Sequence, residues 1–331
     1  MIKKQAIAVI GCGSWGGTIA QYLSEMGHSI TVWHVDDNEV KMFNEKRTHP
    51  FIPHLNFSSS IHFTSDLKEV HCKDILVIAV PSHIVRKIVG ELSTHCDDAI
   101  IVNLAKGIEN DTLMRMSEVI ISAGFDEEKV VSLYGPSHAE EVAKKIPTTV
   151  VAAGKNKGTI EFIQQLFSSD SFRIYTNQDI VGVELGGSIK NIIAIAAGIC
   201  DGIGFGDNTK AALITRGIVE ITRLGTAMGA KKETFAGLSG LGDLIVTCLS
   251  RHSRNRFVGE EIGKGRKLSE ILNSMEMIAE GINTAKSVHS LMNKYSVEMP
   301  ICNAVYLVLF EDIDPMQAVK ELMNRELIYE H

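Results

Sequence analysis

Short apolar runs recur along the first half of the chain, and stretches with helical spacing separate them. After the run Ala6–Ile10, apolar side chains return every three or four residues from Trp15 to Met26, which is the spacing of one helix face. Continuous apolar runs are typical of parallel strands that are buried on both faces. The pattern therefore predicts a doubly wound parallel sheet with helices on both faces. We expect strands within residues 6–10, 30–33, 74–81, 99–104, 129–134, 148–152 and 172–176.

The second half of the chain has a different pattern. From about Asp179 onward, long stretches show helical spacing and no convincing strand run. We therefore expect two domains, an α/β domain over residues 1–180 and an all-α domain over residues 181–331. No proline-rich linker separates them, which favours close packing with a cleft between the domains.

Composition excludes several classes of protein. Of 331 residues, 45% are hydrophobic and 22% charged, as in ordinary globular proteins. A general nucleic-acid binder carries a basic excess, whereas this chain has 33 Lys and Arg against 40 Asp and Glu. Six scattered cysteines without a CxxC pair favour a reducing cytoplasm and predict no metal site. The apolar runs after Lys4 and at residues 191–200 are too short for a signal peptide or a bilayer span, so we expect no stable membrane insertion.

A glycine-rich loop, Gly11-Cys-Gly13-Ser-Trp-Gly16, follows the first strand and opens the first helix. In a dinucleotide-binding loop the first glycine permits the turn, the second lets the backbone approach a pyrophosphate, and the third allows the helix to pack on the strand. The helix N-terminus then faces the anion. A glycine-rich turn without a ligand is the alternative, but the strand and helix on either side favour dinucleotide binding and a Rossmann-type sheet.

The choice between NAD and NADP depends on the end of the second strand. Asp36 and Asp37 lie about 20 residues beyond the loop, where an acid holds the ribose hydroxyl of NAD. A base there favours the extra phosphate of NADP, and His34 is the only candidate. His34 is equally well explained as a partly exposed residue at a strand end with no ligand.

Two segments follow predicted strands at the edge where open parallel sheets bind ligands. One is Asn103–Gly107, which contains Lys106, and the other is Gly135–Ala139. Lys106 fits either a ligand-binding group at this edge or an ordinary solvated lysine.

The helical half also contains polar groups in apolar surroundings. Lys190 stands in a stretch of small and apolar residues, which favours a functional amine over one that extends to water. Asp243 ends a glycine-rich turn, where it is either a helix cap or a site residue. The segment Ser253–Arg256 is either an exposed basic loop or a clamp for an oxyanion.

These motifs together resemble the NAD(P)-dependent glycerol-3-phosphate dehydrogenase family of the bacterial type. The resemblance runs from the glycine loop to the segment AEGINT, and so covers nearly the whole chain. The specific stretches are NLAKG, GPSHAEEVA, ELGGSIKNIIAIAAGICDGIGFGDNTKAALITRG, GLSGLGDLIVTC and SRNR.

The resemblance implies roles for particular residues. Lys190 matches the general acid/base, and Lys106, Asp243 and Thr247 complete the implied catalytic set. The implied substrate-binding residues are Lys106, Gly135, Ser137, Lys190, Asp243, Ser253, Arg254 and Asn255. The implied cofactor-binding residues are Gly11, Gly13, Ser14, Trp15, Gly16, His34, Lys106, Ala139, Arg254, Ile278 and Glu280.

Two positions depart from the family's pattern. His138 replaces the usual aromatic residue of the GPS segment. Many relatives carry a base after a Trp-Gly pair at the second strand's end, whereas this chain reads Trp33-His34-Val35. The cofactor is therefore expected to be NADP or NAD.

The activity implied by the resemblance is the reversible reduction of dihydroxyacetone phosphate to sn-glycerol 3-phosphate, which supplies phospholipid backbones. A phosphorylated small molecule is then the partner, and we expect a cytoplasmic homodimer that binds no nucleic acid. A β-hydroxyacid dehydrogenase on a related plan and a dinucleotide sensor without catalysis are the alternatives. A sensor without catalysis would need the glycine loop but would not need Lys190, Asp243 and Arg254 in the helical half.

Overall fold

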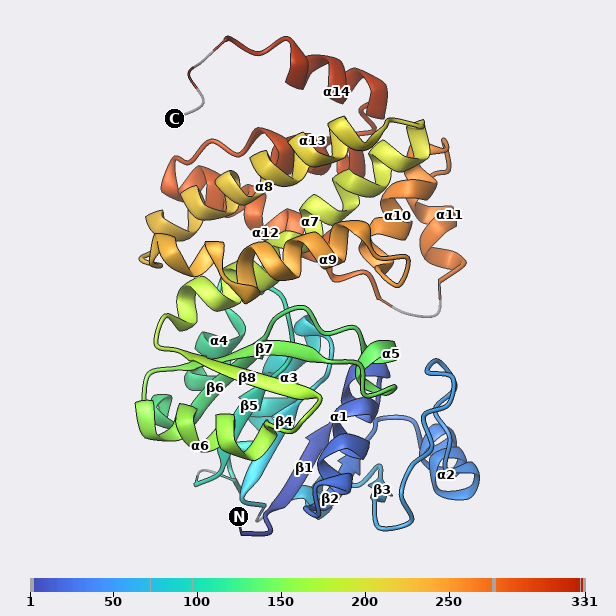
Figure 1. Ribbon diagram of the computed structural model, residues 1–331, viewed down its shortest axis with the longest axis vertical. Helices are drawn as coiled ribbons and strands as arrows, with labels where there is room; N and C mark the ends of the chain where they lie inside the picture. The colour runs from blue at the N-terminus through green and yellow to red at the C-terminus, as the bar shows by residue number, and fades with distance from the viewer. Residues whose placement is uncertain (1–2, 72, 97, 276–277, 328, 330–331) are drawn as a thin grey trace. The chain divides into compact units, whose positions relative to one another are not determined.

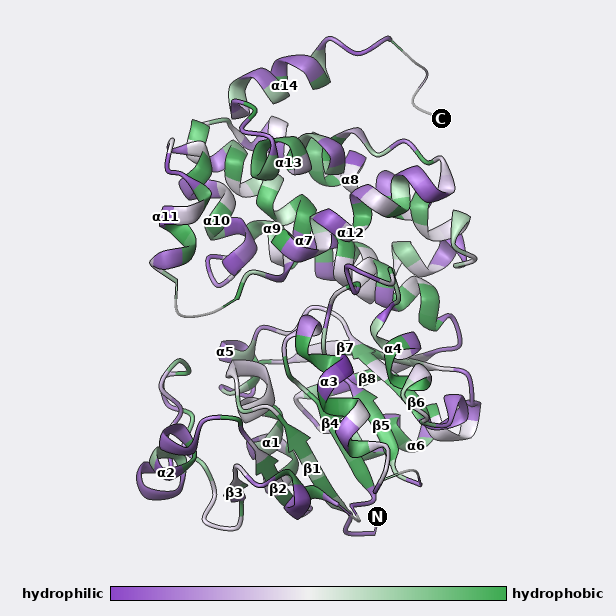
Figure 2. Ribbon diagram, turned by 180° about the vertical axis from the view of Figure 1, so that it is seen from behind, coloured by the Kyte–Doolittle hydropathy of each residue, from purple (hydrophilic) through white to green (hydrophobic). Residues whose placement is uncertain are grey.

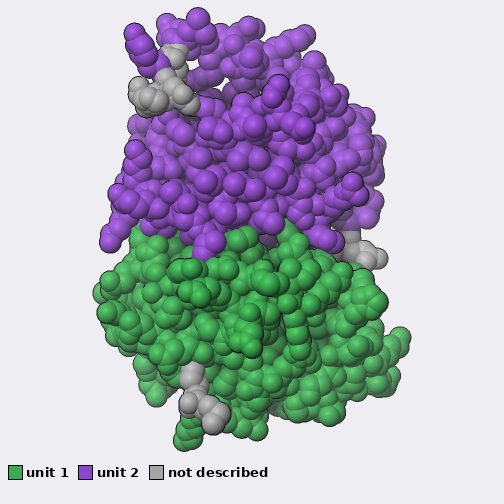
Figure 3. Space-filling model, viewed as in Figure 1, with its two compact units in different colours: residues 1–109, 114–184 green, residues 110–113, 185–331 purple. Residues whose placement is uncertain are grey.

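A computed structural model describes residues 3–71, 73–96, 98–275, 278–327 and 329. The chain divides into two compact units, shown in green and purple in Figure 3. Unit 1 comprises residues 1–109 and 114–184, and unit 2 comprises residues 110–113 and 185–331.

Unit 1 contains one eight-stranded sheet with the strand order β3-β2-β1-β4-β5-β6-β7-β8 (Figure 1). All neighbouring strands are parallel except β6 and β7. The expected α/β fold with a Rossmann-type sheet, followed by a helical region, is confirmed. The strands are β1 (Ala6–Ile10), β2 (Ser29–Trp33), β3 (His62–Thr64), β4 (Ile75–Ile78), β5 (Ile100–Asn103), β6 (Val130–Tyr134), β7 (Thr148–Gly154) and β8 (Phe172–Asn177).

Helices cover both faces of the sheet, and Figure 2 shows its central strands as mostly hydrophobic. Alternate residues of β1 point to opposite faces, so Ile7 and Val9 belong to one core cluster and Ala8 and Ile10 to another. The first cluster includes residues of α1 and α6, and the second includes residues of α3 and α4. The helices of unit 1 are α1 (Ser14–Glu25), α2 (Asp37–Lys46), α3 (Ser82–Leu92), α4 (Met116–Ser122), α5 (Ala139–Val142) and α6 (Lys157–Phe167).

The direction of β7 differs from the all-parallel sheet that the sequence predicted. β7 runs antiparallel to β6, with Leu133 opposite Ala152. A parallel crossover usually contains a full helix. The connection from β6 to β7 contains only the four-residue helix α5. The longer helix α6 then carries the chain back, so β8 is parallel to β7.

Strand β3 was not predicted from the sequence. It has only three residues, His62–Thr64, and two of them are polar. So short a segment shows no apolar run, and its pairing with β2 places it in the sheet.

The described residues of unit 2 form helices joined by turns and irregular segments, with no strand among them. The long helix α7 (Ile180–Ile203) is apolar and long enough to cross a membrane by length and composition, but 89% of its most apolar window is buried inside the structure. The remaining helices are α8 (Asp207–Ala227), α9 (Asp243–Leu249), α10 (Arg254–Gly263), α11 (Leu268–Asn273), α12 (Glu280–Tyr295), α13 (Pro300–Phe310) and α14 (Pro315–Met323).

Glycines bring α7 and α10 into backbone contact. A Cβ atom on Gly198 would lie 1.9 Å from the carbonyl oxygen of Arg256, and one on Gly259 would lie 1.9 Å from that of Ile195. Any side chain at these positions would force the helices apart. This packing explains the small residues near the end of α7 and fixes the beginning of α10 beside it.

A buried carboxylate ties several elements of unit 1 together. Glu184 accepts hydrogen bonds from Arg115 Nη1 at 2.6 Å, from Ser117 Oγ at 2.6 Å and from Ser132 Oγ at 2.8 Å. The Asn103 amide donates to it at 3.3 Å. Burial alone would lower the pKa of Arg115, but the carboxylates of Glu184 and Glu118 outweigh burial and raise it. This network fixes the end of β5, from which the segment bearing Lys106 continues.

Replacing Glu184 by Gln will destabilise the chain, because it leaves the buried Arg115 guanidinium without its main counter-charge. Urea denaturation should show a loss of about 3–5 kcal/mol in the free energy of unfolding. Glu118→Gln is the matched control: it removes a half-exposed partner of the same arginine and should cost less than about 1 kcal/mol. Equal losses in the two variants would contradict the assigned role of Glu184.

Candidate active site

The glycine loop has the geometry that a dinucleotide phosphate requires. Gly11 has φ +106°, and a Cβ there would lie 2.8 Å from the carbonyl oxygen of Ala79. A Cβ on Gly16 would lie 2.0 Å from the carbonyl oxygen of Gly11. At Gly13, by contrast, a Cβ meets no atom within 4 Å, and the residue is exposed at the N-cap of α1. The first and third glycines are therefore needed for packing, and the second leaves open space at a helix N-terminus.

Two histidines contact this loop. The Cys12 amide donates to Nδ1 of His34 at 3.3 Å, and Nε2 of His34 lies 2.6 Å from the Glu39 carboxylate. His49 is buried, and its Nε2 lies 3.2 Å from the Cys12 carbonyl oxygen. Nδ1 of His49 accepts from the Phe51 amide at 3.1 Å, so Nε2 carries the proton and donates to the loop. Burial lowers the pKa of His49, which keeps the ring neutral near pH 7.

Lys106 lies beside the segment that follows β6. Its ammonium donates to the carbonyl oxygen of Gly135 at 3.2 Å and lies 5.5 Å from the centre of the Tyr134 ring. Ser137 also donates to the Gly135 carbonyl, at 3.0 Å. The structure thus brings together the two segments that sequence reasoning placed at the ligand-binding edge of the sheet.

The helical unit holds a buried polar cluster. The Lys190 ammonium donates to Asp243 Oδ1 and, at 2.7 Å, to Thr247 Oγ1. The Thr247 hydroxyl donates to the Asp243 carbonyl oxygen at 2.6 Å. All three residues are buried, with exposed fractions of 5%, 1% and 5% for Lys190, Asp243 and Thr247. Burial raises the pKa of the adjacent Cys248 thiol to about 12, so that thiol stays protonated.

An unusual turn positions Asp243. Residues Leu238–Gly242 form one turn of π-helix directly before α9, a conformation that is frequent at functional sites. A Cβ on Gly186 of α7 would lie 2.8 Å from the Ser239 carbonyl oxygen. The glycine therefore lets the turn approach α7, and Lys190 follows one helical turn later on the same helix.

The beginning of α10 contains the SRNR segment. Ser253 caps the helix, because its hydroxyl accepts from the Arg256 amide at 3.2 Å. The Asn255 side-chain oxygen accepts from the Gly281 amide at 2.9 Å and so joins α10 to α12. Arg254 is exposed in the first turn of α10, whereas Arg256 is bound to Asp201 at 2.7 Å. Ser253 and Asn255 thus have structural roles, and their contact with substrate stays a prediction.

The other candidate residues are distributed between the two units. Trp15 packs against Phe172 with ring centres 6.4 Å apart, and Ser14 is half-buried beside it at the start of α1. Ala139 begins α5 and is buried. In unit 2, Ile278 is 40% exposed and Glu280 begins α12. Their contacts with a nucleotide stay predictions.

Several residues that support the site were not identified from the sequence. Glu39 binds His34, His49 supports the glycine loop, and Glu184 anchors the strand end before Lys106. Glu39 and His49 stand among other polar residues, and Glu184 directly precedes an apolar and glycine-rich stretch, so no local signal reveals the partner of any of them.

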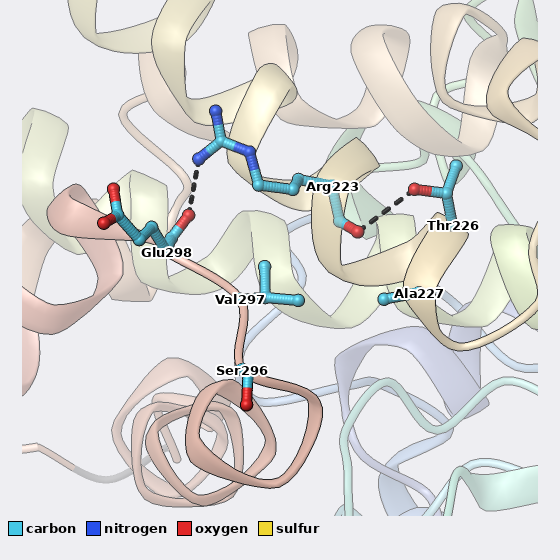
Figure 4. Close-up of a pocket in the computed structure, with 6 residues that line it drawn as sticks. All are labelled: Arg223, Thr226, Ala227, Ser296, Val297 and Glu298. Carbon is cyan, nitrogen blue, oxygen red and sulfur yellow. Dashed lines mark hydrogen bonds between the residues drawn. The ribbon is translucent and has the colours of Figure 1, made fainter.

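Two hollows of unit 2 lie away from Lys190 and Asp243. One, of about 610 Å³, is lined by Arg223, Thr226, Ser296 and their neighbours (Figure 4). There Arg223 donates to the Glu298 carbonyl oxygen at 2.5 Å. A second, largely apolar cavity of about 460 Å³ lies among α7, α8, α13 and α14. Neither is lined by Lys190 or Asp243.

Metal-ligating side chains do not gather in the described part of the chain, where no three His, Cys, Asp or Glu residues are placed to hold an ion. The ionisable groups at the two candidate sites are amines, carboxylates and imidazoles. With a glycine-rich loop of this geometry on a Rossmann-type sheet, this set is typical of a dinucleotide-dependent oxidoreductase.

Comparison with known proteins identifies the family. Residues 6–160 match the N-terminal model, and residues 179–320 the C-terminal model, of NAD-dependent glycerol-3-phosphate dehydrogenase. The chain therefore belongs to this family and is an oxidoreductase that uses NAD or NADP.

Relatives match over nearly the full length. The chain is 50% identical over 325 residues to glycerol-3-phosphate dehydrogenase (NAD(P)+) of Chlorobium chlorochromatii, covering 97% of this chain and 98% of the relative. It is 51% identical to the protein of the same name from a Thermoanaerobacter species, with 98% of each chain covered. The crystal structure of glycerol-3-phosphate dehydrogenase from Coxiella burnetii superposes with a TM-score of 0.93 at 35% identity, covering 97% and 99% of the two chains.

Gly13→Ala should weaken nucleotide binding without harming the fold. The added methyl group meets no protein atom, so the melting temperature should stay the same or rise slightly. The methyl group would occupy the space where a pyrophosphate approaches, and the Kd for NADH should rise at least about tenfold, or 1.4 kcal/mol. Gly16→Ala is the control, because its methyl group clashes with the loop backbone and should lower the melting temperature. Unchanged NADH affinity in Gly13→Ala would contradict this role of the loop.

His49 should make the chain less stable in mild acid. Its pKa is lowered from 6.5 in the folded chain, so below pH 6.5 the unfolded chain binds a proton that the folded chain does not. The free energy of unfolding should then fall by up to about 1.4 kcal/mol per pH unit for this one proton. In His49→Gln, urea denaturation at pH 7.5 and pH 5.5 should show a smaller difference than in the wild type. An identical pH dependence in the two proteins would mean that His49 is not the group that lowers the free energy of unfolding in acid.

Proposed function

We propose that this chain reversibly reduces dihydroxyacetone phosphate to sn-glycerol 3-phosphate and so supplies the backbone of phospholipids. The observation that carries the proposal is the buried Lys190 ammonium between Asp243 and Thr247, in a chain whose full-length relatives carry this dehydrogenase's name. A reductase needs a proton donor for the alcohol that it forms, and an amine held in a buried polar cluster meets that need.

The proposed roles follow the two predicted domains. Residues 1–180 hold the nucleotide at the glycine loop, where Gly13 leaves room and the N-terminus of α1 favours the phosphates. Residues 181–331 supply Lys190 and most of the groups for substrate. NADH or NADPH, when bound, supplies the hydride that the ketone carbon accepts.

Lys190 acts as general acid in the direction of reduction. Negative charge develops on the carbonyl oxygen as the ketone carbon accepts hydride, and the Lys190 ammonium transfers a proton to that oxygen. The amine left behind recovers its proton from solvent before the next turnover. Asp243 and Thr247 each accept an N–H of the ammonium and so fix its direction. In the reverse direction the neutral amine accepts the proton of the substrate alcohol.

The substrate phosphate is negatively charged, so it is bound best by positively charged hydrogen-bond donors. Arg254 is exposed in the first turn of α10, where guanidinium and helix N-terminus both favour an anion. Lys106, beside the Gly135 carbonyl, is proposed to contact both substrate and nucleotide. Gly135, Ser137, Ser253 and Asn255 complete the proposed binding set.

We further propose a cytoplasmic homodimer. The five cysteines of the described residues are buried and form no disulfide, as is usual in a reducing compartment. Size-exclusion chromatography with light scattering would measure the oligomeric state.

The direct test is oxidation of NADH and of NADPH, measured separately at 340 nm, with dihydroxyacetone phosphate and with β-ketoacids. Turnover with the triose phosphate and none with the β-ketoacids is expected. Preferred turnover of a β-ketoacid would favour a β-hydroxyacid dehydrogenase. Absence of oxidation with every ketone, while nucleotide still binds, would favour a sensor.

Lys190→Ala should lower kcat by about 10²–10⁴-fold, because the developing oxyanion loses its proton donor. NADH affinity, measured by fluorescence, should stay near the wild-type value and also shows that the variant is folded. Lys157→Ala is the control, since Lys157 is a 76% exposed lysine whose acidic neighbour on the same helix lies 3.7 Å away. Near-normal kcat in Lys190→Ala would remove this lysine from the mechanism.

A further inference from the structure

We propose that the segment after β2 makes this enzyme select NAD(H) over NADP(H), with Val35 and Glu39 as the residues that set the preference. The inference rests on the proposed function only in taking the glycine loop as the nucleotide site. In a Rossmann sheet the end of the second strand contacts the adenosine ribose, where an acid accepts from the 2′-hydroxyl and an arginine accommodates the 2′-phosphate.

His34 is the only base within residues 34–40, and it is already engaged. Its Nδ1 accepts from the Cys12 amide at 3.3 Å, which fixes the ring against the glycine loop. Its Nε2 lies 2.6 Å from the Glu39 carboxylate. A 2′-phosphate approaching this imidazole would meet a negative charge beside it, so His34 cannot serve as the phosphate's cation.

Acidic groups dominate the rest of the segment. Asp36, Asp37 and Glu39 lie within four residues at the start of α2. Asp36 Oδ1 caps the helix by accepting from the amides of Asn38, at 2.7 Å, and Glu39, at 3.1 Å. The cap fixes the Asp36 carboxylate at the helix end, and within the described residues its Oδ2 has no hydrogen-bond partner that competes with a ribose hydroxyl. The same carboxylates repel a phosphate, which carries about two negative charges.

Val35 occupies the position next to His34, and its side chain is 74% exposed. An exposed apolar side chain gives neither a hydrogen bond nor a charge to a 2′-phosphate. It also has little structural role, so substitution there should leave the fold intact. This position therefore allows the preference to be changed without disturbing the loop.

The nearest other guanidinium along the chain is committed elsewhere. Arg47 follows α2 and donates to the carbonyl oxygens of Ile61 at 2.7 Å and Asn44 at 3.1 Å, and it lies over the Phe63 ring. These contacts hold it at the far end of α2 from Asp36. The acids thus stand next to the strand end and the one arginine is committed, while the exposed Lys41 and Lys46 lie further along α2.

The test is direct titration of the full-length protein with NADH and with NADPH at fixed ionic strength. Energy transfer from the chain's two tryptophans, Trp15 and Trp33, to the reduced nicotinamide reports binding without any substrate. For the wild type, we expect NADH to bind at least about tenfold more tightly than NADPH, equivalent to 1.4 kcal/mol.

Val35→Arg should strengthen NADPH binding about tenfold and leave NADH binding nearly unchanged, because the guanidinium reaches only the extra phosphate. Val35→Gln, which adds length without charge, is the matched control and should leave the ratio of the two dissociation constants unchanged. Glu39→Gln should reduce the discrimination by removing charge beside His34, and should do so less at high salt.

Equal binding of the two nucleotides by the wild type, or an unchanged ratio in Val35→Arg, would overturn the proposal. These outcomes are separate from the enzyme assay. A chain that prefers NADH but fails to reduce dihydroxyacetone phosphate would support this inference and contradict the proposed function. A chain that binds NADPH and NADH equally, and reduces dihydroxyacetone phosphate equally well with both, would support the proposed function and contradict this inference.

Discussion

The proposed chemistry depends on one interaction, an amine paired with a carboxylate inside a helical unit. Taking an ammonium and a carboxylate out of water costs several kcal/mol for each ion, and their attraction compensates only when further hydrogen bonds satisfy both groups. Lys190, Asp243 and Thr247 meet that condition, because each donates to or accepts from another. Such a cluster is a poor way to gain stability, and this is why we propose a chemical role for it.

Much of the fold serves to hold such groups in position. Glycines let α7 approach both α10 and the π-turn before Asp243. In unit 1 the glycines of the loop likewise let α1 approach the end of β1. Glu184 fixes the end of β5, which the segment containing Lys106 follows. Buried polar networks and close backbone contacts are both intolerant of substitution, which suits sites that need fixed geometry.

The features that could be predicted from the sequence are those that a local pattern of residues determines. Continuous apolar runs located every long strand, and the glycine loop has the open and crowded positions that its motif predicts. It failed on the direction of β7 and on the short β3, because pairing and not composition decides both. The partners of His34, His49 and Glu184 also depended on folding. Glu184 and Ser117, for example, are 67 residues apart in the chain. The roles of the site residues toward substrate and nucleotide stay predictions.

Chemical rescue measures the central claim most directly. Lys190→Ala, saturated with NADH and dihydroxyacetone phosphate, would be assayed with increasing methylamine, which can replace the missing ammonium. The account predicts a rate that rises with the concentration of protonated amine, and no such rise for the wild type or for Lys157→Ala. A variant that binds both ligands yet shows no amine-dependent rate, or that needs no amine to reach the wild-type rate, would contradict it.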